Sequence, residues 1–111
     1  MLSYQTESHS VEAYSFSARV LFDGQQQRLL GVGNGLLSSA VDALRQRFGL
    51  SLAIEDYHEH TLGHQSQSRA VAYIRCTLAH GEAAYGVGID VDSASASLQA
   101  LFNVAARYLA K

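Results

Sequence analysis

Residues 13–35, AYSFSARVLFDGQQQRLLGVGNG, hold the pattern from which the fold is predicted. Over residues 13–22, aromatic and aliphatic side chains alternate with serine and arginine. This period of two is typical of a β-strand with one buried and one solvated face. Asp23-Gly24 then predicts a tight hairpin turn, because both residues tolerate a positive φ. Residues 25–33 are the expected returning strand.

A helix and a preceding strand complete the predicted first half of the chain. After Asn34-Gly35, apolar residues recur at the spacing of one helix face. Gly49 stands where a C′ glycine ends a helix. Residues 2–8 alternate more weakly and are the expected first strand. The apolar residues at helical spacing are Leu37, Val41, Leu44 and Phe48.

The second half of the chain repeats this plan. His80-Gly81 takes the place of the first hairpin turn, and Asp92 or Ser93 is expected to cap a second helix. Three further strands are predicted over residues 51–60, 69–79 and 82–91. The apolar stripe of the second helix comprises Ala94, Leu98, Leu101, Ala105 and Leu109.

Two glycine motifs indicate an internal duplication. GVGNG at residues 31–35 and GVGID at residues 86–90 lie 55 residues apart, and each closes a hairpin strand and opens a helix. We therefore predict an α+β fold of duplicated β-β-β-α units, in which one helix covers each antiparallel sheet. The expected organisation is a single domain, 1–111, with pseudo-repeats at about 2–49 and 50–110 that bury their remaining apolar surface against each other or a second chain.

Composition narrows the function classes. Charged residues make up 16 % of the chain, against about 25 % in a typical domain, which favours a self-associating domain or a fragment of a larger protein. A net charge of −2 does not provide the positive charge that binding to nucleic acid or an anionic membrane requires. A single cysteine, no long apolar run and no signal-peptide pattern predict a cytoplasmic domain. The length excludes a catalytic (β/α)8 barrel.

The glycine motifs do not have the spacing of nucleotide-binding loops. Leu36 stands where a dinucleotide fingerprint needs its third glycine, and no Gly-Lys-Ser/Thr sequence ends a P-loop. Two interpretations stay open. The glycines and the following helix N–H groups suit a ligand carboxylate, which gives a dimer four candidate niches, or they simply permit a tight strand-to-helix turn.

Reactive side chains elsewhere have structural explanations that we favour. His58 and His60 project from one strand face, as two zinc ligands would, but His64 must fold back and Glu59 points away, so we expect no metal site. Cys76 lies mid-strand among apolar residues and is expected to be a buried, unreactive thiol. No catalytic group is predicted.

Asp90 and Asp92 suggest a cation site, but helix capping explains aspartates at such a position. Residues 61–68, between two expected strands, are either a loop that closes over a ligand or simply a loop.

The order of the motifs resembles one family, the C-terminal regulatory domains of 2-isopropylmalate synthases, over about residues 2–109. The resemblance implies a homodimer in which leucine, the pathway end product, binds between two regulatory domains and inhibits the distant catalytic domain of the same polypeptide. It implies no cofactor in this domain, since the family's divalent metal is in the catalytic barrel. The motifs are Gly33-Asn34-Gly35, Asp56-Tyr57-His58-Glu59-His60 with Leu62-Gly63, Ala70-Val71-Ala72-Tyr73-Ile74, Gly86-Val87-Gly88-Ile89-Asp90 and Ala96-Ser97-Leu98-Gln99-Ala100.

The same resemblance carries the family's leucine pocket onto eight residues. Small side chains leave room for an isobutyl group, Ile89 offers an apolar contact, and glycine and helix N–H groups meet the carboxylate. Thr61 and Ser68 stand where the family often has alanine, and Leu36 where proline often follows Asn-Gly. The implied pocket comprises Gly33, Asn34, Gly35, Tyr57, Thr61, Ser68, Ala70 and Ile89.

Three alternatives to a leucine-responsive domain stay open. The isoleucine-responsive domain of citramalate synthases has a similar plan, and pocket shape at Thr61, Ser68 and Ile89 would discriminate the two. A dimerisation module with no functional ligand site is slightly favoured by the extra hydroxyls. A small metal-dependent enzyme using the histidines ranks last.

Overall fold

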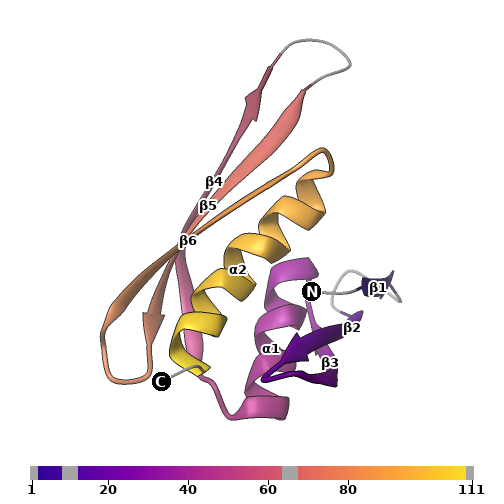
Figure 1. Cartoon of the computed structure of the whole chain (residues 1–111). Helices are drawn as coiled ribbons and strands as arrows, with labels where there is room; N and C mark the ends of the chain where they lie inside the picture. Colours follow the sequence, from indigo (N-terminus) through magenta and orange to yellow (C-terminus); the bar gives the residue numbers. More distant parts are fainter. Residues whose placement is uncertain (1–2, 9–12, 64–67, 110–111) are drawn as a thin grey trace. The chain divides into compact units, whose positions relative to one another are not determined.

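The computed structural model describes residues 3–8, 13–63 and 68–109. The chain divides into two compact units, Met1–Ser51 (unit 1) and Leu52–Lys111 (unit 2). Each unit contains a three-stranded antiparallel sheet followed by one helix (Figure 1), so the predicted α+β fold with β-β-β-α twice is confirmed. Neither described helix is long and apolar enough to cross a membrane.

In unit 1 the sheet order is β1-β2-β3, and β2 pairs with both neighbours. Asp23 has a φ of 55° and Gly24 a φ of 78°, so the predicted hairpin turn with two positive φ values is confirmed. Gly49 ends the helix in the left-handed region and donates its N–H to the Arg45 carbonyl, as predicted. The elements are β1 (Ser3–Ser8), β2 (Tyr14–Phe22), β3 (Gln25–Gly33) and α1 (Leu36–Phe48).

Helix α1 turns small residues toward the sheet. Of the predicted apolar stripe only Leu44 is buried, while Leu37, Val41 and Phe48 are half-buried, so the stripe was centred on the wrong face. The reason is the close approach of α1 to β3: a Cβ added at Gly31 would lie 2.1 Å from the Ser39 carbonyl oxygen. Large side chains do not fit between backbones at that distance. The fully buried helix residues are Ser39, Ala40, Ala43 and Leu44.

In unit 2 the sheet order is β4-β5-β6, and the second hairpin turn differs from the first. The Gly81 N–H donates to the Leu78 carbonyl (2.8 Å) and the Leu78 N–H donates to the Glu82 carbonyl (2.9 Å). With Gly81 at a φ of 92°, this is a three-residue loop, one residue longer than Asp23-Gly24. The elements are β4 (Leu52–Leu62), β5 (Arg69–Leu78), β6 (Ala83–Asp90) and α2 (Ser93–Leu109).

A β-bulge in β4 decides which way its side chains face. The register with β5 shifts between Ile54 and Asp56, so Tyr57 pairs with the buried Ile74 on the side of the sheet covered by α2. His58 and His60 therefore share the opposite face, as predicted.

The repeat register at the strand-to-helix junctions is 57 residues and not 55. A Cβ at Gly31 would lie 2.1 Å from the Ser39 carbonyl oxygen, and one at Gly88 would lie 2.0 Å from that of Ala96. Gly31 therefore corresponds to Gly88, and the 55-residue pairing with Gly86 was wrong. The longer turn of unit 2 accounts for part of the difference.

Candidate functional site

The first candidate site is the junction between β3 and α1. Gly35 is the N-cap of α1 in an extended conformation (φ 178°) and supplies no side-chain acceptor. The first turn of α1, which the structure describes in full, carries no acidic residue. A Cβ added at Gly35 would meet nothing within 4 Å. The junction therefore has open space beside helix N–H groups, which carry partial positive charge.

Two side chains hold this junction in shape. The Asn34 N–H donates to Ser38 Oγ (3.0 Å), and Ser38 Oγ donates to Asn34 Oδ1 (2.7 Å). Ser38 Oγ is also 3.3 Å from the Gly35 carbonyl oxygen. The Asn34 side chain is thus anchored to the first turn of α1 and stays exposed at its entrance.

Asp42 joins β3 to α1 from the helix side. Its Oδ2 accepts hydrogen bonds from the Val32 N–H (2.9 Å) and from Gln46 (2.7 Å), and its Oδ1 accepts one from Arg45 (2.6 Å). The bond from the Val32 N–H, followed by that from Arg45, lowers the pKa of the Asp42 carboxyl below its usual 3.8. Asp42 is therefore ionised at neutral pH, and sequence reasoning missed it.

The junction between β6 and α2 is closed by its own side chains. Asp92 Oδ2 accepts hydrogen bonds from the Ser95 N–H (3.0 Å) and Ser95 Oγ (2.8 Å), which confirms the predicted cap. Asp90 accepts the Asp92 N–H (3.0 Å) and a bond from Gln99 (3.0 Å). Gln99 in turn accepts the Ile89 N–H (3.2 Å). Two carboxylates thus occupy this helix N-terminus.

Tyr57 lies over the start of α2. Its hydroxyl is 2.6 Å from Ser97 Oγ and donates to Glu59 Oε2 (2.7 Å). The residue is 38 % exposed. Burial, and to a lesser degree Glu59, raises the pKa of the Tyr57 phenol above its usual 10.0. The hydroxyl is therefore a neutral group fixed by two partners.

The other predicted pocket residues of unit 2 do not share one face. Thr61 pairs with the buried Ala70 on the side that Tyr57 occupies. Ser68 is half-buried at the start of β5. Ile89 pairs with Val71 on the opposite side of the sheet and is 47 % exposed. The remaining three predicted residues, Gly33, Asn34 and Gly35, belong to unit 1.

The metal and thiol alternatives have different outcomes. Among the described residues no group of three histidine, cysteine or acidic side chains could hold a metal ion. His64 lies outside the described residues, so the proposed three-histidine set is not tested. His58 is 3.2 Å from Asp56. Cys76 is fully buried, which raises the pKa of its thiol, so the prediction of a buried thiol is confirmed.

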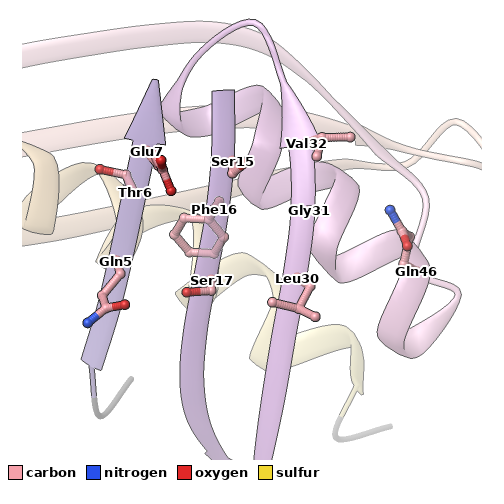
Figure 2. A pocket seen from close by; sticks show the side chains of 10 residues that line it. All are labelled: Gln5, Thr6, Glu7, Ser15, Phe16, Ser17, Leu30, Gly31, Val32 and Gln46. Carbon is pink, nitrogen blue, oxygen red and sulfur yellow. The ribbon is translucent and has the colours of Figure 1, made fainter. Parts of the chain in front are cut away.

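Sequence reasoning also missed a hollow on the sheet of unit 1. It has a volume of about 340 Å³, and side chains of all three strands line it (Figure 2). Ser15 and Ser17 on the central strand leave room between Gln5 on one side and Leu30 and Val32 on the other. The alternation of serines in β2 is the sequence signal for this hollow. None of the eight predicted pocket residues lines it.

Comparison with known proteins gives a consistent result. The model of the LeuA allosteric (dimerisation) domain family matches residues 1–109. The chain is 42 % identical to 2-isopropylmalate synthase of Marinomonas sp. (strain MWYL1) over 103 residues, which is 93 % of this chain and 18 % of that protein. It is 46 % identical to the enzyme of Rhodospirillum rubrum over 85 residues (77 % and 15 %) and 35 % identical to that of Saccharomyces cerevisiae over 107 residues (92 % and 17 %). The match thus spans less than a fifth of each of these relatives.

Proposed function

The chain belongs to the LeuA allosteric (dimerisation) domain family, and from this premise we propose that it binds leucine as a feedback effector of a cytoplasmic 2-isopropylmalate synthase. In this role the domain works as a homodimer and acts on the catalytic domain of the same polypeptide. Leucine regulates that domain only if it binds two conformational states with different affinity.

The difference between the two junctions is the observation that supports this proposal. A free amino acid brings a carboxylate, and a helix N-terminus without a side-chain cap satisfies it with backbone N–H groups. At α1 the cap is Gly35, beside open space, and the exposed Asn34 amide oxygen stands close by as an acceptor for an ammonium group. We therefore assign the carboxylate of the effector to the N-terminus of α1.

The junction of unit 2 is excluded as a second site on the same physical grounds. Asp92 already accepts the first-turn N–H of Ser95, and Asp90 lies beside it. A ligand carboxylate there would replace an existing cap and meet two like charges. The proposal therefore requires one leucine per chain. In a dimer, leucine then occupies two of the four niches that the repeated glycine motif suggests.

Calorimetric titration of the domain with leucine, isoleucine and valine tests the proposal, with zinc as a control. We expect leucine to bind with a stoichiometry near one per chain and more tightly than isoleucine or valine. Tighter binding of isoleucine would identify the citramalate synthase type of domain instead. Absence of heat for all three amino acids, with an intact dimer by sedimentation, would leave a dimerisation module without a ligand site.

A further inference from the structure

Two arginines stand side by side on the sheet of unit 1. Arg19 of β2 and Arg28 of β3 are direct register partners, and Ser3 of β1 completes their row. Gly31 is in close contact with α1, and side chains alternate between the two faces of a strand, so Arg28 lies on the side away from the helix. We name this side the outer face of unit 1. Like charges directly opposite each other destabilise a sheet, so the pair is unfavourable without a bound anion.

The described residues do not compensate the charge of this pair. The two arginines of α1 each donate a hydrogen bond to a neighbouring side chain, whereas no described acidic side chain forms an ion pair with Arg19 or Arg28. Glu7 pairs with Ser15, four residues from Arg19 along β2, and Asp23 is four residues from Arg19 in the other direction. Four strand residues span roughly 13 Å, which exceeds the screening length of about 8 Å in physiological salt. The pair is therefore a local concentration of positive charge.

A hollow of about 380 Å³ opens at the arginine pair. Both guanidinium side chains line it, together with the neutral hydrogen-bonding residues Ser3, Gln5 and Ser17. Gln5 and Ser17 also line the hollow of about 340 Å³ described above, so the two hollows adjoin on the outer face (Figure 2). That second hollow includes Leu30, which is 53 % exposed, and Val32, which is 63 % exposed. The combined site thus has a cationic end and a partly apolar end.

The hydrogen-bonding groups at the cationic end favour a phosphate over a carboxylate. Each guanidinium carries five N–H donors in a planar fork that binds such anions through two hydrogen bonds, and the Ser3 and Ser17 hydroxyls and the Gln5 amide add further donors. A carboxylate offers two oxygens and one negative charge. A phosphate monoester offers three terminal oxygens and carries a charge of about −1.5 to −2 at pH 7. A phosphate can therefore bind both guanidinium groups at once and neutralise the pair.

We propose that the outer face of unit 1 binds a small phosphorylated organic molecule, with its phosphate between Arg19 and Arg28 and its less polar part against Leu30 and Val32. The two hollows together have the size and the mixture of apolar and polar lining that small-molecule sites need. None of the eight residues of the implied leucine pocket lines either hollow. The site is therefore separate from the one assigned to leucine, and it does not depend on the proposed function.

Calorimetric titration with phenyl phosphate, inorganic phosphate and benzoate tests this site. We expect wild type to bind phenyl phosphate more tightly than inorganic phosphate, which lacks the apolar part, and more tightly than benzoate, which lacks the phosphate. Arg19→Gln and Arg28→Gln should each bind phenyl phosphate at least about tenfold more weakly, since each removes charge-assisted hydrogen bonds. Arg75→Gln is the matched control, because Arg75 lies on the central strand of the other sheet and pairs in register with Asp56. It should bind phenyl phosphate as wild type does.

Thermal unfolding gives a second readout and checks that each variant is folded. Without ligand, Arg19→Gln and Arg28→Gln should unfold at the wild-type temperature or above it, because they relieve the repulsion between like charges. Phenyl phosphate should raise the unfolding temperature of wild type and Arg75→Gln but not that of the other two variants.

Four results would overturn the inference. They are no binding of phenyl phosphate by wild type, unchanged affinity in Arg19→Gln and Arg28→Gln, equal weakening in Arg75→Gln, and benzoate binding as tight as that of phenyl phosphate. Gly35→Asp distinguishes this site from the N-terminus of α1: it should bind phenyl phosphate as wild type does, and loss of binding would place the anion at the helix instead. A leucine titration of wild type tests the proposed function separately, so either proposal can fail alone.

Discussion

The two strand-to-helix junctions share a backbone plan and differ in how the helix N-terminus is satisfied. Gly31 and Gly88 let a helix backbone approach a strand to nearly the same distance. At α2 the carboxylate of Asp92 caps the helix, whereas at α1 Gly35 leaves the cap without a side chain. The two junctions therefore share their packing and differ in their chemistry, and the uncapped junction is the one that suits an anionic ligand.

A second pair of equivalent residues, Asp42 and Gln99, also differs in chemistry between the two junctions. Asp42 accepts the Val32 N–H and Gln99 accepts the Ile89 N–H, and both pairs are related by 57 residues. An ionised carboxylate and a neutral amide thus make the same bond at equivalent places. Substitutions that alter one junction at a time distinguish the effect of the shared packing from that of the differing chemistry. We expect substitution of the packing glycines, Gly31 and Gly88, to have the largest effect on the free energy of unfolding.

Gly31→Ala should destabilise the protein most, by about 3 kcal/mol or more, because the added methyl would lie 2.1 Å from a backbone oxygen that cannot move without shifting α1. Gly88→Ala should cost a similar amount. Gly35→Ala is the matched control and should cost less than about 1 kcal/mol, the difference between glycine and alanine at an N-cap. Urea unfolding measures all three, and equal stability of Gly31→Ala and Gly35→Ala would contradict the close approach.

Asp42→Ala should cost about 2 kcal/mol at pH 7, since it removes charge-assisted hydrogen bonds from a carboxylate whose side chain is 15 % exposed. The pKa of Asp42 is lower in the folded protein than its usual 3.8, so this stability is present above that value and lost as the pH falls through the folded-state pKa. Asp42→Asn, which resembles Gln99, should lose less. Unfolding of wild type and Asp42→Ala from pH 7 to pH 2 checks the prediction; a difference that does not shrink with acid argues against it.

Asp92→Ala should cost about 1 kcal/mol, the usual value of an N-cap, while Asp92→Gly, which copies the junction of unit 1, should cost only a few tenths. Denaturant unfolding at pH 7 distinguishes the two. If both variants are as stable as wild type, the cap of α2 is unimportant and the contrast between the junctions loses its energetic basis.

Tyr57→Phe should cost about 0.5–1 kcal/mol, because it removes one hydroxyl with hydrogen bonds to Ser97 and Glu59. Tyr57→Ala should in addition weaken leucine binding while the dimer persists, as the family resemblance implies. Calorimetry together with sedimentation is the measurement; unchanged leucine affinity in Tyr57→Ala would remove Tyr57 from the predicted pocket.

Much of the fold could be predicted because it depends on local patterns. The alternation in β2, the Asp23-Gly24 turn and Gly49 each act within a few residues. The repeat register could not be predicted in the same way. The extra residue in the second turn shifts the register of the repeats without changing the apolar pattern. The bulge between Ile54 and Asp56 likewise shifts the register of β4 with β5.

The candidate site was harder to predict from the sequence, because it also depends on register and not on local patterns. Asp42 contacts a strand residue ten positions away, and its partner in the repeat, Gln99, becomes visible only with the 57-residue register. Ile89 was grouped with Tyr57, yet the two face opposite sides of the sheet. A family resemblance identifies residues in the sequence, but the strand register decides on which face of the sheet each residue lies.

The most direct test of the proposed carboxylate site is calorimetric titration of Gly35→Asp and Gly35→Asn with leucine. Both side chains have nearly the same size and can cap α1, but only aspartate places a negative charge where we assign the effector carboxylate. We predict that Gly35→Asp binds leucine at least about tenfold more weakly than Gly35→Asn, with no loss of stability. Equal leucine affinity of Gly35→Asp, Gly35→Asn and wild type would contradict this assignment.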